Sequence, residues 1–259
     1  MTNPDIAAFF HCERIEVFAE VGIADIPAPD RDYIREFFPG AGSVIVFAQE
    51  IPDPVYRMPP KEKTREMLKI AEALDTTSIR LSHLLNEAGI PAKRVPLYLP
   101  VTITDGTVRG LVRLKQTAAA GGLGVIGKSS LLITPHYGPR VFLSGVVTGR
   151  GISESGQKYC SVPAGASEPE SPASPVPPLC TGCGLCIKNC PGNAFGPDGR
   201  VDAFRCMTIR PWVPPVAVPV AKWLLGRSFL LRCAAPLAPR FARFATMPCS
   251  ECVTGCLRF

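Results

Sequence analysis

Apolar and polar positions along residues 1–150 predict helices interspersed with strands. Ser43 to Ala48 form a β-branched, apolar run, which predicts a buried strand. From Lys61 to Ala88 apolar residues recur at helical spacing until Gly89 ends the pattern, which predicts one long amphipathic helix. Val95 to Ile103 are predicted to be extended. This mixture indicates an α/β or α+β domain.

A glycine-rich stretch in the middle of the chain contains two nucleotide-binding patterns at once. The dinucleotide pattern G-x-G-x-x-G is formed by Gly122, Gly124 and Gly127. The P-loop pattern covers Gly122 to Ser129, and both patterns require a strand before the glycines and a helix after them. Here Leu114 to Ala120 predict a helix and Ser130 to Thr134 predict a short strand, so the order is reversed. We therefore expect no nucleotide site, and a glycine turn packed against backbone stays open as the alternative.

Composition and charge narrow the class of protein. The 259 residues are 46% hydrophobic, which is enough for one main domain and a smaller appendage. No apolar stretch reaches membrane-spanning length and the N-terminal residues lack the layout of a signal peptide, so we expect a cytoplasmic protein. The formal net charge of +6 permits an RNA or acidic partner without requiring one. Eleven cysteines in such a chain indicate metal rather than disulfides.

The strongest chemical signal is the run from Cys180 to Pro191, which has the spacing C-x-x-C-x-x-C-x-x-x-C-P of bacterial ferredoxins. In that arrangement three thiolates hold one cubane cluster and the fourth ligates another. By this crossing order one [4Fe-4S] cluster is assigned to Cys180, Cys183, Cys186 and Cys256. The second cluster is assigned to Cys190, Cys206, Cys249 and Cys252. Zinc is the alternative for paired cysteines, but a zinc site has no use for further cysteines at these spacings.

Two neighbouring clusters serve to move single electrons from a donor to an acceptor.

Residues 151–179 are rich in Ser, Pro, Ala, Gly and Glu and predict a linker or loop before the cysteine-rich region 180–259. Three cysteines remain outside the two sets and are interpreted as small packing residues or free thiols. They are Cys12, Cys160 and Cys233.

The segment 210–247 separates Cys206 from the last three cysteines. Its large apolar residues, among them Trp212 and Trp223, alternate with arginines and lysines and are interrupted by prolines. Such an apolar and basic stretch predicts docking on a membrane surface or a partner protein, or a lid that covers a cofactor with its arginines outward.

At four places the chain resembles the cobalamin- and iron–sulfur-dependent reductase family of the epoxyqueuosine reductases and reductive dehalogenases. These places are residues 38–46, 121–128 and 132–140, and the cysteine set with the lone Cys206. The resemblance implies an α+β fold, with a nitroreductase-like cobalamin-binding domain over 1–150 followed by a ferredoxin-like domain with two [4Fe-4S] clusters over 180–259.

In this family the glycine run and the strand after it belong to the corrin cradle, where missing side chains allow a flat macrocycle to approach the backbone. The cofactor-binding residues that the resemblance implies are Gly122, Gly124, Gly127, Lys128, Leu132, Arg140, Leu143 and Thr208. The chain lacks the D-x-H-x-x-G pattern that supplies a lower axial histidine. The expected cobalamin is therefore base-off, with no histidine ligand.

The sequence indicates the catalytic proton donor less clearly than it indicates the cluster ligands. The candidates are Tyr98 and Asp105, with Lys128 as a third. Asp105 is displaced from the family's acidic position and has no following proline, so an Asp-Gly hairpin turn is the alternative for it.

The chain also stops three residues after Cys256, without the helical extension that binds tRNA in the family, and Leu257 replaces the usual proline. We therefore expect a substrate other than tRNA, with tRNA kept open.

Together these features predict an oxygen-sensitive, cobalamin-dependent reductase that receives electrons through two [4Fe-4S] clusters and reduces a small organic substrate. The expected electron donor is a ferredoxin or flavodoxin. The alternative is a non-catalytic electron-transfer module that reduces a separate corrinoid protein or enzyme. In either case the role of the protein is to bind and orient the cofactors and to shield them from solvent.

Overall fold

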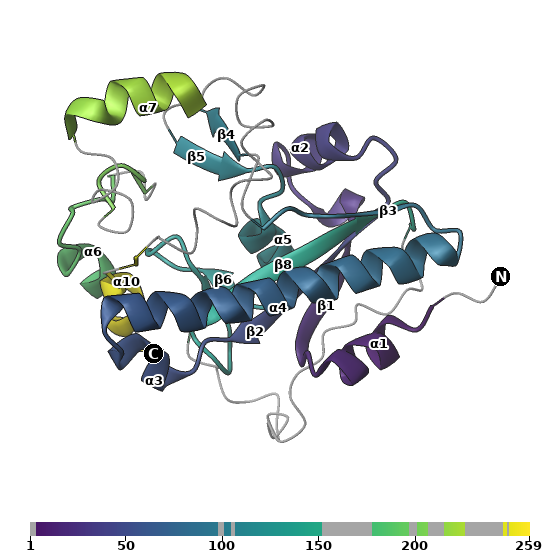
Figure 1. Ribbon diagram of the computed structural model, residues 1–259, viewed down its shortest axis with the longest axis horizontal. Coiled ribbons are helices and arrows are strands. Elements are labelled where there is room, and N and C mark those ends of the chain that lie inside the picture. The colour runs from purple at the N-terminus through teal and green to yellow at the C-terminus, as the bar shows by residue number, and fades with distance from the viewer. Residues whose placement is uncertain are drawn as a thin grey trace.

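The computed structural model describes residues 4–97, 101–104, 107–151, 178–196, 201–206, 215–225, 246–247 and 249–259. In these ranges the chain is a mixed α/β structure (Figure 1). Its helices are α1 (Ile6–Glu13), α2 (Asp30–Phe37), α3 (Asp53–Arg57), α4 (Pro60–Glu87), α5 (Leu114–Ala120), α6 (Leu185–Lys188), α7 (Val218–Leu225) and α10 (Glu251–Thr254), with short 3-10 turns at Ile23–Asp25 and Pro215–Ala217. Its strands are β1 (Val17–Gly22), β2 (Ser43–Glu50), β3 (Ala92–Arg94), β4 (Val101–Thr104), β5 (Thr107–Gly110), β6 (Val125–Ile126), β7 (Leu132–Ile133) and β8 (Val141–Thr148).

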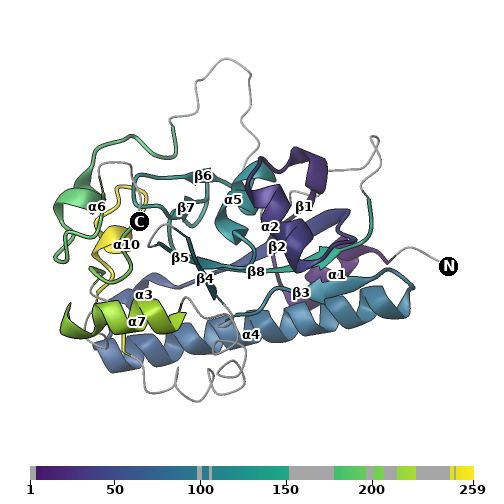
Figure 2. The same cartoon turned by 90° about the horizontal axis from the view of Figure 1, so that it is seen from above.

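The central sheet has four antiparallel strands in the order β1-β2-β8-β3. Its middle strand β2 is buried along its first six residues because both faces of the sheet are covered. On one face α4 and α1 pack against Phe18, Ile45 and Phe47. On the other face α5 and α2 pack against Val44 and the neighbouring strand residues (Figure 2). A strand covered on both faces needs a continuous apolar run, which is why the segment lacks polar alternation.

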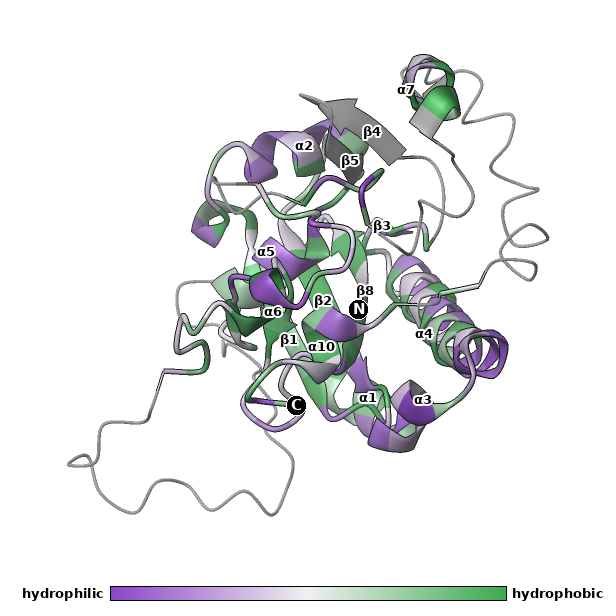
Figure 3. Ribbon diagram, turned by 90° about the vertical axis from the view of Figure 1, so that its left-hand side faces the viewer, coloured by the Kyte–Doolittle hydropathy of each residue, from purple (hydrophilic) through white to green (hydrophobic). Residues whose placement is uncertain are grey.

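The helix α4 spans the length of the sheet. Its buried positions recur at helical spacing, including Leu74, Leu81 and Leu85, and its outer side is hydrophilic (Figure 3). The predicted long helix over 61–88 is therefore confirmed, as is the predicted buried strand over 43–48. The helix α5 also forms where helix-forming residues predicted one.

The predicted extended stretch from Val95 to Ile103 is confirmed at its end, which lies in a strand, whereas Val95 to Leu97 belong to no strand and positions 98–100 lie outside the described residues. β3 ends at Arg94, and β4 begins at Val101 and belongs to a separate hairpin with β5. Pro96 explains the break, since it has no N–H with which to continue the ladder of hydrogen bonds. In the described parts of the chain, no helix combines the length and the apolar character that crossing a membrane requires.

Candidate functional site

The two cysteine-bearing segments meet at one end of the molecule, near the N-terminal end of α4 (Figures 1 and 3). Each carries a single-turn helix, and these two helices, α6 and α10, contact each other. Gly182 and Gly184 precede α6 with φ of 72° and 74°. Glycine adopts this left-handed conformation without strain, so the backbone between the first cysteines turns sharply.

The first cysteine set surrounds a cavity of about 50 Å³. The cysteines that line it are Cys180, Cys183, Cys186 and Cys256, the four assigned to one cluster by the ferredoxin order. Lys128, Ser129 and Ile133 line the side formed by the larger domain. Burial, followed by the charges of Cys180 and Cys183, raises the pKa of Cys186. The loop after the glycine run thus forms one wall of the cavity.

The second cysteine set lies beside the first and is more enclosed at Cys252. Burial raises the pKa of Cys252 to about 11, and the charges of Cys206, Cys249 and Cys190 add to the shift. These thiols are close enough to repel one another as thiolates, which is the situation that bound metal relieves. The amide of Ala194 donates a hydrogen bond of 3.4 Å to the Sγ of Cys190.

The cysteine thiols of both sets are suitable ligands for cubane clusters. Eight thiols in two sets of four match the ligands of two [4Fe-4S] clusters. Within the described residues, no group of three or more His, Cys, Asp or Glu side chains closes around a single metal-ion position. The ligation itself stays a prediction. Of the three cysteines outside the sets, Cys12 is exposed, and Cys160 and Cys233 lie outside the described residues.

The last cysteine segment is anchored to α4 and α3. Lys63, which is 4% exposed, donates a hydrogen bond of 3.2 Å to the hydroxyl of Ser250. The amide of Met247 donates one of 2.7 Å to the hydroxyl of Thr64. Met247, Val253 and Phe259 also pack against an apolar cluster built on α3 and α4. These contacts fix Cys249 and Cys252 relative to the larger domain.

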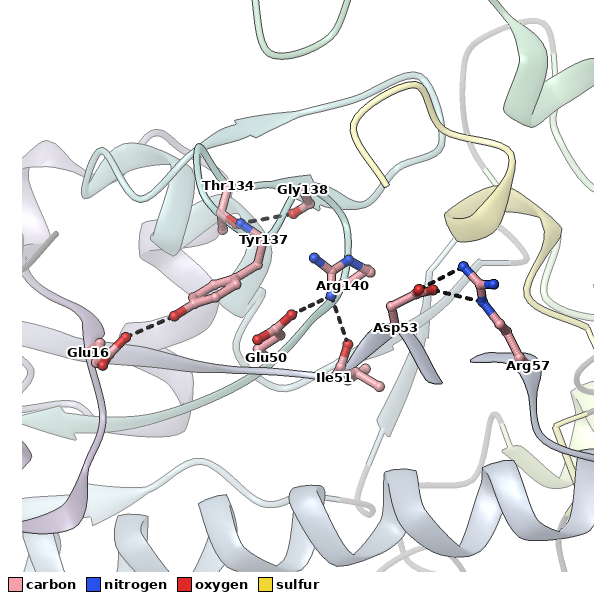
Figure 4. Close-up of polar contacts among 9 residues, drawn as sticks. All are labelled: Glu16, Glu50, Ile51, Asp53, Arg57, Thr134, Tyr137, Gly138 and Arg140. Atoms are coloured by element: carbon pink, nitrogen blue, oxygen red, sulfur yellow. Dashed lines mark hydrogen bonds and ion pairs between the residues drawn. The ribbon is translucent and has the colours of Figure 1, made fainter. Parts of the chain in front are cut away.

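Arg140, which directly precedes β8, contacts both the end of β2 (Figure 4) and the same cysteine segment. Its Nη1 forms an ion pair with Glu50 and also donates to the carbonyl of Ile51, and its guanidinium carbon lies 5.5 Å from the centroid of the Phe259 ring. The Tyr56 ring meets Phe259 edge-on at 5.4 Å. Burial raises the pKa of Tyr56, an effect that the charge of Arg140 opposes and that of Cys252 reinforces. Arg140 is a predicted cofactor-binding residue. Its observed contacts are with other residues of the chain.

The glycine run packs against its own chain. A Cβ on Gly124 would lie 2.2 Å from the carbonyl oxygen of Ile133, and one on Gly127 would lie 2.5 Å from the Ile133 side chain. Gly122 has open space around it, and its φ of 80° favours glycine there. The predicted order of helix, glycines and strand is confirmed by α5 and β7, although β7 is only two residues long. These contacts give each of the two positions a packing reason to be glycine, and the binding of a corrin there stays a prediction.

The other predicted cofactor-binding residues that the structure describes are Lys128, Leu132 and Leu143. Lys128 lines the first cysteine cavity, and Leu132 is 2% exposed in the core. Leu143 is half-buried against the same core cluster. The remaining predicted site residues, Thr208, Tyr98 and Asp105, lie outside the described residues. The strands that flank the predicted Asp105 turn do pair as a hairpin, with Thr104 opposite Thr107.

Sequence reasoning missed the residues that hold the second cysteine set against the larger domain. They include Glu50, Tyr56 and Lys63, and Lys115 is a further buried cation whose pKa the charge of Cys252 affects. Lys115 donates a hydrogen bond of 2.6 Å to the carbonyl of Ser130, and its burial lowers its pKa while the charge of Cys252 opposes the shift. None of these residues belongs to a local pattern, because their partners are distant in the sequence.

Comparison with known proteins gives consistent results. No family model matches the chain. It is 34% identical over 91 residues to an epoxyqueuosine reductase from Lactococcus garvieae, covering 35% of this chain and 21% of the relative. A relative with the same name from Gloeobacter violaceus is 30% identical over 154 residues, covering 57% of this chain and 40% of the relative. These matches span less than half of each relative.

Solved structures extend the similarity to nearly the whole chain. The structure of epoxyqueuosine reductase from Streptococcus thermophilus aligns with a TM-score of 0.55 at 14% identity, covering 98% of this chain and 65% of that one. The Bacillus subtilis enzyme aligns with a TM-score of 0.53 at 16% identity, covering 97% of this chain and 64% of that one. At such identities the alignments establish a similar fold.

Proposed function

Because the chain is a divergent relative of the epoxyqueuosine reductases, we propose that it is an oxidoreductase that passes single electrons through two [4Fe-4S] clusters. The observation that carries the proposal is the gathering of eight cysteines into two adjacent sets of four. The matched parts of the curated relatives support the reductase class.

The chain's own residues would hold the clusters from two directions. Cys180 and Cys183 precede α6, Cys186 lies within it and Cys256 follows α10, so each helix contributes to the first site. Cys190 and Cys252 reach from the same two helices toward the second site. When bound, such clusters supply one-electron transfer at potentials set by hydrogen bonds, charge and exposure. The adjacency of α6 and α10 therefore keeps the two sites close together.

Neighbouring groups of the chain would adjust the reduction potentials of the clusters at both sites. The amide that Ala194 donates to the Sγ of Cys190 stabilises negative charge on that sulfur. Lys128 and Arg258 line the first cavity and place positive charge beside it. Partial burial around Cys252 lowers the local dielectric constant, which strengthens the electrostatic effects there.

The proposal includes no step through cobalamin. The family resemblance implies that cofactor for a reductase that acts on its own substrate. The alternative function is an electron-transfer module that reduces a separate corrinoid protein or enzyme. Anaerobic purification with added base-off cobalamin distinguishes the two, since retained corrin supports the reductase that acts on its own substrate. Loss of corrin with intact clusters supports the module.

The proposed substrate class is a small organic molecule that accepts two electrons. Epoxyqueuosine, named in the relatives, is the first compound to assay, both free and within tRNA. Binding of tRNA that weakens steeply with salt, together with epoxide turnover, would establish tRNA as the substrate carrier. Turnover of a small acceptor without tRNA binding would support the proposed class.

Iron analysis tests the cluster proposal directly. Anaerobically reconstituted protein is expected to contain about eight iron and eight sulfide per chain. Cys183→Ala and Cys252→Ala should each lose about four of each, because they disrupt different sites. Cys12→Ala is the matched control and should retain all eight, since Cys12 lies outside both sets. Zinc in place of iron, or full iron content in both ligand variants, contradicts the proposal.

A further inference from the structure

The cysteines of the two sets differ in their access to solvent. Cys183 is exposed, whereas the other seven are only partly accessible. Cys183 lines the first cavity, so this cavity approaches the molecular surface on its side. Electron tunnelling weakens steeply with distance. The surface near Cys183 is therefore where an electron carrier would come closest to a group held by the first set.

Exposed apolar side chains gather around this cavity. Among the described residues six large hydrophobic side chains are exposed, and three of them lie near the cavity, the other three belonging to residues 216–223. Leu257 is 66% exposed and lines the cavity itself. Val125 and Ile126 are 41% and 37% exposed on β6, whose partner strand contributes Ile133 to the cavity. Exposed apolar groups that cluster in this way mark interaction surfaces.

Positive charges border the apolar groups. Lys128 is exposed, two positions after Ile126, and lines the cavity. Lys188 is exposed on α6, and Arg258 lines the cavity next to Leu257. The acidic residue on the adjacent helix α10 is Glu251, so among these described residues the three cations outnumber the acid. We name the set Val125, Ile126, Lys128, Lys188 and Leu257 the rim surface.

An apolar patch bordered by cations is complementary to a partner whose apolar patch is bordered by carboxylates. We propose that the rim surface docks a small acidic electron-carrier protein, an inference that rests on the proposed function. In the docked pair one electron leaves the reduced carrier and enters the cluster held by the first cysteine set. The carrier is oxidised by one electron, the cluster is reduced by one, and no covalent bond forms or breaks.

The test compares two substitutions at one exposed position that is not a cluster ligand. Ile126→Glu and Ile126→Lys introduce similar polarity with opposite charge, so any difference between them reports the charge of the partner. Cluster reduction by reduced flavodoxin is followed by anaerobic stopped-flow absorbance at low and high salt. We expect Ile126→Glu to lower the second-order rate constant about tenfold relative to Ile126→Lys at low salt, and salt to remove the difference.

Two controls separate this inference from the proposed function. Arg35→Glu makes a charge reversal on α2, far from the cavity, and should leave the flavodoxin rate unchanged (Figure 1). Dithionite should reduce the clusters of every variant equally, because it needs no docking surface. Equal flavodoxin rates for the two Ile126 variants, with dithionite reduction intact, would overturn the docking inference alone. Protein that binds no iron would overturn the proposed function itself.

Discussion

The guanidinium of Arg140 lies beneath the ring of Phe259, with 5.5 Å between the guanidinium carbon and the ring centroid. The same guanidinium pairs with Glu50, which lies near the end of β2, so Arg140 connects the central sheet to the segment that carries the last cysteines (Figure 4). The stability of this end of the two central strands and the position of the segment that carries Cys252 therefore both depend on one side chain.

Replacing Arg140 tests that connection. Arg140→Met keeps most of the apolar stem but removes the charge, leaving Glu50 without its partner and Phe259 without a cation below it. We expect the free energy of unfolding to fall by about 1–3 kcal/mol, since the Arg140 side chain is only 15% exposed. Anaerobic urea denaturation measures the loss.

The matched control for Arg140 is Arg57, which pairs with Asp53 at 2.7 Å on the nearby helix α3. Its side chain is 76% exposed, so Arg57→Met should cost at most about 1 kcal/mol. Equal losses of unfolding free energy in the two variants would show that the Arg140 contacts stabilise the protein no more than an exposed ion pair does.

The glycine run gives a second prediction. Gly124→Ala would place a Cβ 2.2 Å from a backbone oxygen that has no easy way to move, and should cost more than about 2 kcal/mol of stability. Gly122→Asn should cost about 1 kcal/mol or less, because asparagine tolerates positive φ and nothing lies within 4 Å of the position. Thermal unfolding of the two variants checks this order, and a more stable Gly124→Ala protein would refute the packing explanation.

Local patterns were sufficient to predict several elements. β2, α4 and α5 form where apolar periodicity and helix propensity placed them, because each buries its own pattern against the adjacent layer. The ferredoxin spacing also predicted which cysteines meet at the first cavity. Cys180, Cys183 and Cys186 are close in the sequence and turn glycines restrict the backbone between them, whereas Cys256 lies far along the chain and was assigned by the crossing order of ferredoxins.

Contacts between distant residues could not be predicted in this way. Glu50 and Arg140 are 90 positions apart, and Lys63 and Ser250 are 187 apart. No periodicity links such pairs, so the anchoring of the cysteine segment becomes visible only in the fold. The same holds for Gly124, whose neighbour Ile133 approaches because β6 and β7 pair.

Tyr137 provides a prediction about pH. Burial and a hydrogen bond of 2.8 Å to Glu16 raise its pKa to about 12, above the ordinary value near 10. A raised pKa means that the folded state favours the neutral phenol. Its contribution to stability is therefore fully present below about pH 10 and is lost as the pH rises through about 12.

Ultraviolet difference titration against Tyr137→Phe measures this ionisation. The tyrosinate absorbance assigned to Tyr137 should appear later than that of an exposed tyrosine, and Glu16→Gln should shift it toward lower pH by removing the neighbouring charge. A midpoint for Tyr137 near pH 10 in the unsubstituted protein would contradict the contact.

The final prediction concerns Lys128, which the P-loop pattern would assign to a phosphate and which the structure places at the first cysteine cavity. Reduction adds negative charge to a cluster, and a nearby cation stabilises the reduced state. Removing that cation should therefore lower the reduction potential. An exposed charge contributes about 0.5–1 kcal/mol, which corresponds to about 20–40 mV for one electron.

Lys128→Gln is compared with Arg35→Gln in a spectroelectrochemical titration under anaerobic conditions. The Lys128 variant should retain its iron and show the lower potential, whereas the Arg35 variant should match the unsubstituted protein, because α2 lies far from the cavity. An isothermal titration with ATP accompanies the experiment. Saturable ATP binding that disappears in Lys128→Gln, with an unchanged potential, would restore the nucleotide interpretation of the glycine run.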